Sequence, residues 1–519
     1  MNRVLARDLV LALSIANLLM MRSWAQLAWP RNHYFLGSQP DPDGVAAALL
    51  CLIALATLLF VVGRRLGRMS ATPARRTAGW LALPLLVGIG LNGLRQQVPA
   101  LSAGALAKWP GRPLGAVLAG GVSLALLWVL KRHGAYGLAR AAERVAIGLA
   151  PLILVTSGQT LWQLSPLQAS HYRDLPPAPS SARHVAQRRV LLVIFDGLDQ
   201  SLLFDDRPAG FAAPVFDTFR AEALSWQNAY PPSCTTLVSL PSILTGRALE
   251  AAEPAGPGEL RLTSDRGEPV DWAKASIFSR MQGGGTASAL IGWYHPYCRI
   301  LGNQVSRCAW LPYFRPPALS VPARARDVAL GILETVPGVY RIMRQGGFRP
   351  SGVSVEPTWH VQIFRTVHAE TLRAVGDDSL DFVVAHYPIP HEPYVFDRQT
   401  GRLKASSEGE YVDNLALADR TLGELLSAVG SSARGSETTI IVSADHGLRR
   451  PEPADRCVGF PTIGNLKHRV PLLIRFPRRA GSAVRQEVLR TSRLGIVATG
   501  VLDGSVRDGS DAAAVLQGN

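Results

Sequence analysis

Charge is scarce in this 519-residue sequence, and negative charge is nearly absent from its first third. Only 18% of the residues are Asp, Glu, Lys or Arg, against about 25% in ordinary soluble domains. Residues 1–164 contain sixteen Lys and Arg but only four acids, so they carry most of the net charge of +15. Because this basic excess is confined to one part and the remainder is nearly neutral, the net charge does not indicate nucleic-acid binding.

What the first third has instead is long apolar runs. A transmembrane helix needs about 20 apolar residues, and five stretches are long enough. They are Leu9–Trp29, Val45–Val62, Ala78–Leu94, Leu114–Leu130 and Val145–Leu164. We therefore expect residues 1–164 to form a five-helix transmembrane domain. The first stretch also fits a cleaved signal peptide, but four further spans would remain and no clear small-x-small cleavage site is present.

The loops between these stretches predict how the domain faces. Lys and Arg are concentrated in alternate loops, with eleven bases on one side and about five on the other. Since cytoplasmic loops carry the excess of Lys and Arg, the N-terminus is expected inside. Five crossings then place the rest of the chain outside, after a Pro-containing linker at residues 165–187. Residues 188–519 form the predicted outer domain.

Cysteine is also rare, and its distribution fits an oxidising compartment. The chain has five cysteines, and four of them, Cys234, Cys298, Cys308 and Cys457, lie in the outer domain. An even number allows two disulfides in three pairings, of which we expect Cys298–Cys308 first because it closes a short loop. Buried thiols are the alternative.

The outer domain contains short, almost continuously apolar runs with helical patterns between them. Arg188–Phe195, Ser288–Trp293, Leu380–Ala385 and Thr438–Ser443 resemble strands, and Tyr411–Val429 has apolar residues at helical spacing. Continuous apolar strands indicate a sheet that is buried on both faces, and hence an α/β domain with a mainly parallel, helix-covered sheet. In such a sheet the ligand site lies at the carboxyl ends of the strands.

Acids and histidines follow three of these strands directly. Asp196 ends the first, His386 ends the third with His391 soon after, and Asp445 and His446 follow the fourth. His468 is a possible addition. Carboxylate and imidazole ligands suit Zn²⁺ or Mn²⁺. Taken singly, each residue fits an ordinary turn or a hydrogen-bonded polar group equally well, and it is their joint placement that predicts a metal site.

A hydroxyl-rich segment precedes another apolar run. Residues 231–246 read PPSCTTLVSLPSILTG, in which Ser and Thr mark a helix start and Gly246 its end. Unpaired backbone N–H groups at a helix N-terminus attract phosphate and stabilise an alkoxide. Helix capping alone is the plain interpretation, whereas a hydroxyl that also touches a metal becomes a nucleophile.

Taken together, these motifs resemble those of the alkaline-phosphatase/sulfatase superfamily. The elements that carry the resemblance are Phe195-Asp196-Gly197, Thr236 nine residues before Thr245-Gly246, His386-x4-His391-x-Pro393, and Ser443-Ala-Asp445-His446-Gly447. The apolar anchor with an outer domain is similar to the membrane phosphoethanolamine transferases and lipoteichoic acid synthases. The resemblance implies a bacterial cytoplasmic (inner) membrane protein with its catalytic domain on the periplasmic or extracellular side.

The resemblance also implies roles for individual residues. Thr236 would be the nucleophile, with Thr235 and Ser233 as fallbacks. The metal that Thr236 touches would be held by Asp196, Asp445 and His446. His391 would be a substrate-side or second-metal histidine, with His386 as its companion and His468 as a further ligand.

Three departures from the family pattern leave the reaction open. The transferases usually have Glu at the position of Asp196, whereas the hydrolases of the superfamily have Asp there. The sulfatase motif C/S-x-P-S-R is missing, because Thr236 occupies the nucleophile position and Cys234 lies two residues too early. The transferases also have a histidine shortly after D-H-G, whereas here the next one is the distant His468.

We therefore expect a metal-dependent enzyme that uses one or two Zn or Mn ions. It would transfer a phospho-head-group from a membrane phospholipid to a cell-envelope glycan or lipid, through a phosphothreonine. The alternative within enzymes is a membrane-anchored phosphodiesterase, phosphatase or sulfatase-like hydrolase. An alternative of another class is a non-catalytic envelope sensor or scaffold.

Overall fold

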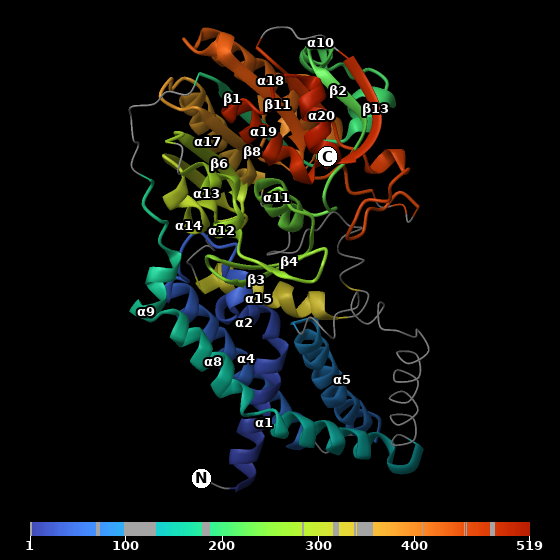
Figure 1. Ribbon diagram of the computed structural model, residues 1–519. Helices are drawn as coiled ribbons and strands as arrows, with labels where there is room; N and C mark the ends of the chain where they lie inside the picture. Colours follow the sequence, from blue (N-terminus) through green and yellow to red (C-terminus); the bar gives the residue numbers. More distant parts are fainter. Residues whose placement is uncertain are drawn as a thin grey trace. The chain divides into compact units, whose positions relative to one another are not determined.

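The computed structural model describes most of the chain (Figure 1). The described residues are 3–68, 73–97, 131–178, 187–282, 285–314, 321–336, 339, 357–406, 408–450, 452, 454–477 and 483–518. They form two compact units. Unit 1 comprises Met1–His33, Ser38–Ser170 and Pro316–Ser354, and unit 2 comprises Tyr34–Gly37, His171–Arg315 and Val355–Asn519.

The expected linker at residues 165–187 is divided, with Ser165–Ser170 in unit 1 and the part from His171 in unit 2. Apart from this, the division differs in two places from the boundaries expected from the sequence. Residues 316–354, expected in the outer domain, group with unit 1, and Tyr34–Gly37, expected in the anchor, groups with unit 2. The physical reason for the first difference is α15 (Val321–Thr335), whose Val328 is buried in a cluster with apolar residues of unit 1. The second difference places a short N-terminal segment within the unit that holds the candidate site.

Unit 1 is helical. Its helices include α1 (Arg3–Leu19), α2 (Met21–Ala28), α3 (Pro30–His33), α4 (Pro42–Arg68), α5 (Pro73–Gln97), α8 (Leu152–Gln163), α9 (Pro166–Ala169) and α15, and residues 131–148 are also helical. Four of the five predicted spans fall on described helices. The fourth, Leu114–Leu130, lies outside the described residues.

Two helices in the described part of the chain are long and apolar enough to cross a membrane. They are Pro42–Arg65, with a mean hydropathy of 3.0, and Lys131–Gln163, with 1.5. The first predicted span is divided between α1 and α2, each shorter than 18 residues. The third corresponds to α5, which carries Pro84 in its interior. Five membrane crossings therefore remain a proposal, and the two apolar helices are a weak indication of membrane association.

Unit 2 is built around an eight-stranded sheet, as predicted for its core strands. The order is β13-β2-β12-β11-β1-β8-β6-β7, and β12 alone runs antiparallel to both of its neighbours. The strands are β1 (Arg189–Asp196), β2 (Leu224–Tyr230), β6 (Ser288–Tyr294), β7 (Arg307–Pro312), β8 (Phe382–Pro390), β11 (Thr438–Ala444), β12 (Leu472–Arg475) and β13 (Ala483–Arg490). The mainly parallel α/β sheet is thus confirmed.

Helices cover both faces of this sheet, which explains why its central strands are mostly apolar. Every residue of β1, β8 and β11 is buried. One face packs against α10 (Pro214–Glu222), α17 (Pro357–Val375) and α18 (Tyr411–Ser431). The other packs against α11 (Thr236–Thr245), α13 (Ile277–Met281) and α19 (Leu494–Asp503). Alternate residues of β1 enter the two cores.

Short elements complete unit 2. They are β3 (Leu249–Gly256), β4 (Glu259–Ser264) and β5 (Pro269–Val270) in a separate sheet, the hairpin β9 (Phe396–Asp397) and β10 (Arg402–Leu403), and the helices α12 (Trp272–Ala275), α14 (Tyr297–Ile300) and α20 (Gly509–Gln517). Two disulfides, Cys298–Cys308 and Cys234–Cys457, join parts of the unit. The first is the pairing that the sequence favoured.

Helix α11 begins and ends where the sequence predicted. Thr235 is its N-cap residue in an extended conformation, and Gly246 ends it in the left-handed conformation with φ of 67°. A Cβ at Gly246 would lie 2.4 Å from Ile496 Cγ1, so both the conformation and the space require glycine. Because the extended Thr235 is the N-cap, Thr236 is the first residue of the helix.

Candidate metal centre

Neighbouring parallel strands bring the predicted metal ligands together. β1 ends at Asp196 and β11 ends one residue before Asp445, and the two strands pair in parallel with Phe195 beside Ala444. Ligand atoms of Asp196, Asp445 and His446 all lie within 4.8 Å of one another, and all three residues are buried. This is the arrangement expected at the carboxyl edge of a parallel sheet.

Hydrogen bonds orient the ligands toward one point. Asp445 Oδ1 accepts from the backbone N–H groups of Gly197, at 3.1 Å, and His446, at 2.8 Å. The His446 Nδ1–H donates to the Gly447 carbonyl at 2.7 Å. The lone pair of His446 Nε2 is then directed toward the carboxylates, 3.3 Å from Asp196 Oδ1. A histidine whose second nitrogen is fixed in this way is typical of metal sites.

Three buried polar atoms at this place lack hydrogen-bond partners among the residues that the structure describes. They are Asp196 Oδ1, Asp445 Oδ2 and His386 Nε2. Leaving such atoms without a partner is costly, and buried polar groups nearly always have one. A divalent cation would satisfy oxygen and nitrogen atoms of this kind, so the residues present fit a metal ion.

The electrostatics point the same way. Burial, followed by repulsion from Asp445, raises the pKa of Asp196 well above its ordinary value. Burial, together with the Arg449 guanidinium, lowers the pKa of His446 to about 3, so the imidazole is neutral at physiological pH. A neutral imidazole beside two carboxylates provides the electron pairs that a cation requires.

The hydroxyl of Thr236 lies at this cluster. Thr236 is buried, and its Oγ1–H donates to Asp196 Oδ2 at 3.3 Å. The fallback nucleophiles are oriented differently. The Ser233 hydroxyl donates to the Gly459 carbonyl at 2.8 Å, and the Thr235 hydroxyl lies 3.4 Å from that of Ser233. Of these three hydroxyls, it is therefore that of Thr236 which contacts a carboxylate of the cluster.

The other predicted histidines are placed differently from one another. His386 is buried on β8, with Nε2 3.7 Å from Asp196 Oδ2. His391 follows β8, and its ring lies 6.2 Å from the His446 ring. Desolvation, then Arg449 and His446, lowers the pKa of His391 to about 4. His468 is not brought to the cluster, because its Nδ1 accepts from Thr462 N and its Nε2 lies 3.1 Å from the Asp455 carbonyl.

Sequence reasoning missed Arg449, which is exposed and reaches back over the site. Its Nη2 lies 3.3 Å from His446 Nε2. The next residue, Arg450, instead forms a bidentate ion pair with the buried Asp199. Two arginines shortly after the D-H-G motif, separated from it by Leu448, were the available signal, but the sequence does not show which of them faces the ligands.

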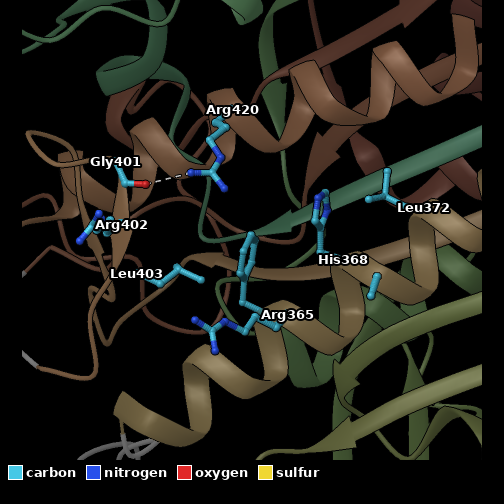
Figure 2. A pocket seen from close by; sticks show the side chains of 9 residues that line it. Arg365, His368, Leu372, Gly401, Arg402, Leu403 and Arg420 are labelled. Carbon is cyan, nitrogen blue, oxygen red and sulfur yellow. Dashed lines mark hydrogen bonds between the residues drawn. The ribbon is translucent and has the colours of Figure 1, made fainter.

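The larger of two cavities described in unit 2 lies away from these residues. It measures about 520 Å³ and is formed by α17, α18 and the β9–β10 hairpin (Figure 2). Arg365, Arg402 and Arg420 line it, with His368 and apolar side chains. None of the predicted ligands contributes to it. At the candidate site there is instead a narrow cavity of about 10 Å³, lined by His446, Arg449 and the Cys234–Cys457 disulfide among others.

Fold and site together define a class of protein. A buried Asp–Asp–His cluster, a hydroxyl at a helix N-terminus and an open-sheet edge suit metal-dependent cleavage of phosphate or sulfate esters. Residues 363–495 match the family model described as Sulfatase. This match confirms the predicted relationship to the sulfatase and alkaline-phosphatase superfamily. The matched residues include His386, His391, Asp445, His446 and His468. Asp196 and Thr236 lie before the matched residues and are not part of the match.

Comparison with solved structures gives distant similarities. The chain is similar to a phosphonate monoester hydrolase of Agrobacterium radiobacter, with 16% identity, 61% of this chain and 74% of that chain covered and a TM-score of 0.38. It is also similar to a sulfatase from Pseudoalteromonas sp., with 16% identity, coverage of 66% and 70% and a TM-score of 0.39. A third is a protein in the alkaline phosphatase superfamily from Vibrio parahaemolyticus, with 13% identity, coverage of 63% and 68% and a TM-score of 0.39. No curated protein matches the chain.

Proposed function

We propose that this chain is a membrane-anchored, metal-dependent enzyme that transfers a phospho-head-group from a membrane phospholipid to a hydroxyl of a cell-envelope glycan or lipid. Thr236 is the nucleophile in this proposal. The observation that carries it is the hydrogen bond from the buried Thr236 Oγ1 to Asp196 Oδ2, because Asp196 belongs to the candidate metal cluster.

Asp196, Asp445 and His446 would hold a divalent cation, Zn²⁺ or Mn²⁺, and His386 or His391 would serve a second one. When bound, such an ion offsets negative charge on the nucleophile and on the phosphoryl oxygens. The chain's own contribution begins with Thr236. Its oxygen forms a bond to phosphorus as the bond to the glycerol oxygen of the lipid breaks. Asp196 Oδ2 orients the Thr236 hydroxyl through their hydrogen bond. The hydroxyl proton passes to water, and the departing diacylglycerol oxygen takes up one proton from water in exchange.

His391 is suited to the second step. Its Nδ1–H donates to the Glu392 carbonyl at 2.5 Å, which leaves the Nε2 lone pair available. Because the pKa of His391 is lowered to about 4, the ring is neutral at physiological pH. A neutral imidazole accepts the proton of the incoming hydroxyl as that oxygen attacks phosphothreonine and releases Thr236.

The anionic phosphoryl oxygens of the ester need a positively charged partner, and in this proposal Arg449 is that partner. Its guanidinium lies at the ligand cluster, with Nη2 3.3 Å from His446 Nε2. Guanidinium groups bind phosphate oxygens in a bidentate manner. Arg449 would therefore orient the ester while Thr236 attacks.

Two observations support a lipid donor outside the cytoplasm. Helix Pro42–Arg65 is long and apolar enough to cross a bilayer, so it would confine the enzyme to the plane of its donor. Unit 2 also carries two disulfides, which form in oxidising compartments such as the periplasm. The proposed location is the bacterial cytoplasmic membrane, with unit 2 on the outer side.

Hydrolysis with water as the acceptor is the second candidate. Asp196 favours it, because the hydrolases of this superfamily have Asp where the transferases usually have Glu. Sulfate-ester chemistry through an oxidised cysteine is not proposed, since Thr236 occupies the nucleophile position and Cys234 is joined to Cys457. Analysis of envelope lipids and glycans from cells with and without the protein separates the candidates: transfer predicts a modified acceptor, and hydrolysis an uncleaved ester that accumulates without the protein.

The decisive experiment is intact-mass detection of a covalent adduct on the Thr236 peptide, after the purified full chain is incubated with phospholipid vesicles and Zn²⁺ or Mn²⁺. We expect a phospho-head-group on Thr236 and no adduct in Thr236→Ala, with turnover reduced at least about 100-fold. Thr235→Ala is the matched control, because it removes the neighbouring hydroxyl. Full turnover in Thr236→Ala would falsify the assignment.

A further inference from the structure

The segment Tyr34–Gly37 is an unusual part of unit 2. The chain before it, up to His33, and the chain after it, from Ser38, belong to unit 1. Tyr34 itself is fully buried within the core of unit 2 that contains α11. A short segment from the N-terminal part of the chain is thus part of the unit that carries the candidate site.

A buried arginine fixes this segment in place. Arg299 donates to the carbonyls of Leu36, at 2.8 Å, and Gly37, at 2.6 Å. The same guanidinium donates to the carbonyls of Tyr172 and Pro257. A second fixed point is backbone pairing, in which Phe314 N–H donates to the Phe35 carbonyl. Since a buried guanidinium must have its donors satisfied, the segment and Arg299 stabilise each other.

From this segment a chain of hydrogen bonds leads to the candidate nucleophile. The Tyr34 hydroxyl lies 2.6 Å from His295 Nδ1, and His295 Nε2 lies 3.1 Å from the Thr236 carbonyl. A carbonyl only accepts, so His295 Nε2 carries the proton. Burial lowers the pKa of His295 to about 3, so the ring is neutral and its Nδ1 accepts from the Tyr34 hydroxyl.

Backbone strain next to His295 supports a functional reading of this chain of contacts. Tyr294 has a φ of 74°, the one positive φ of a non-glycine residue in the described parts of the sequence. Such strain costs about 1–3 kcal/mol and persists where the surroundings enforce it. Phe35 of the same segment packs edge-on against Tyr294, with ring centroids 5.2 Å apart. The segment therefore contacts both the strained Tyr294, through Phe35, and the adjacent His295, through Tyr34.

We infer that Tyr34 and His295 are positioning residues for Thr236, so that the N-terminal segment completes the active site of unit 2. Threonine is β-branched and its χ1 is restricted, so the orientation of its backbone determines where its hydroxyl lies. A hydrogen bond that fixes the first peptide group of α11 thereby fixes Oγ1 relative to Asp196. Neither residue touches the reacting atoms. The inference rests on the proposed role of Thr236 as nucleophile.

The test compares five variants of the full chain in detergent: Tyr34→Phe, His295→Ala, the double variant of these two, His295→Gln and Tyr387→Phe. Tyr387→Phe is the matched control, because Tyr387 is a buried tyrosine whose hydroxyl lies 3.0 Å from a different histidine, His368. Turnover is measured with bis(4-nitrophenyl) phosphate. Amide hydrogen exchange of the peptide at the start of α11 is measured in parallel and does not depend on activity.

We expect Tyr34→Phe to lower kcat about 10-fold and His295→Ala about 100-fold, with KM changed less than about 2-fold. The double variant should be no slower than His295→Ala, because both act through one contact. His295→Gln, which retains an N–H donor, should recover part of kcat. Exchange at the start of α11 should rise in the Tyr34 and His295 variants and stay unchanged in Tyr387→Phe.

Wild-type kcat and exchange in Tyr34→Phe would overturn the inference, and so would losses that multiply in the double variant. If the wild-type chain cleaves no ester while the exchange pattern is as expected, the proposed function fails and the positioning contact stands. If the ester is cleaved and exchange is the same in all variants, the positioning contact fails and the proposed function stands.

Discussion

Asp196 and Asp445 are held close together in a buried place where two negative charges are expensive. Burial and the neighbouring charge both raise the pKa of Asp196. A carboxyl with a raised pKa stabilises the folded state while it is protonated, at low pH, and this contribution is lost as pH rises through the raised pKa. Metal-free protein should therefore lose this part of its stability between acid and neutral pH.

The effect of added metal on thermal unfolding should have the opposite pH dependence. A cation must displace the proton from Asp196, so its affinity should increase as pH rises. We expect Zn²⁺ or Mn²⁺ to raise the Tm of the full chain by several degrees at pH 8 and by clearly less at pH 5. A concentration of 100 times Kd corresponds to about 2.7 kcal/mol. Scanning calorimetry of chelator-treated protein measures this, and an equal shift at both pH values would contradict it.

Arg449 should act on substrate binding. If its guanidinium holds the anionic oxygens of the ester, Arg449→Ala should raise KM about 10- to 100-fold, which is a loss of roughly 1.4–2.8 kcal/mol. Arg449→Lys should recover part of that loss, because lysine keeps the charge without the planar fork. Arg402→Ala is the control, since Arg402 lines the remote cavity of Figure 2. Steady-state kinetics decide: an unchanged KM in Arg449→Ala would remove it from the binding site.

The sequence predicted side chains whose position follows from strand ends and helix starts. Asp196 and Asp445 end parallel neighbours, and Thr236 begins a helix, so spacing alone brings them together. Arg449 and His295 could not be predicted in this way. Whether Arg449 or Arg450 faces the ligands depends on the buried partner Asp199. The two partners of His295 both lie far upstream in the chain, 59 and 261 residues before it.

At the scale of elements, the central strands were predictable and the outer ones were not. β1, β6, β8 and β11 are runs of apolar residues because both of their faces are covered. β13 is largely exposed or half-exposed, and β12 has only four residues, so neither has a comparable pattern. Their pairing with β2 at one side of the sheet depends on contacts that local sequence does not encode.

The Cys234–Cys457 disulfide links an element of the site to a loop beyond it. Cys234 lies two residues before Thr236, and its backbone N–H donates to the Gly459 carbonyl at 2.9 Å. The bond holds the loop after Arg450 against the start of α11. The Cys298–Cys308 disulfide spans only 10 residues, which makes it a natural comparison.

We expect Cys457→Ala, in a chain that also carries Cys234→Ala, to lower kcat about 10-fold and stability by about 2–4 kcal/mol. Cys298→Ala with Cys308→Ala should leave kcat within about 2-fold while it lowers stability by less, because the closed loop is shorter. Urea unfolding and ester turnover measure the two effects. Equal kcat losses in both pairs would show that stability alone, rather than the start of α11, determines turnover.

At the scale of the whole molecule, the number of membrane crossings determines where unit 2 operates. Five crossings with the N-terminus inside place the C-terminus outside the cytoplasm, whereas an even number would place it inside. We expect a reporter that is active only outside the cytoplasm to be active when it is fused after Asn519. Fusion before Met1 should give no activity. The reverse pattern would contradict both the charge-based topology and an oxidising location for unit 2.

The place of Tyr34 in unit 2 has a consequence for how the protein is made. Its partner His295 lies 261 residues later in the chain. At 5–20 residues per second, ribosomes need on the order of tens of seconds to synthesise that interval. During this time the Tyr34–Gly37 segment lacks the residues of unit 2 against which it packs. Unit 2 can therefore complete its fold only after the segment and the sequence around His295 have both reached the same compartment.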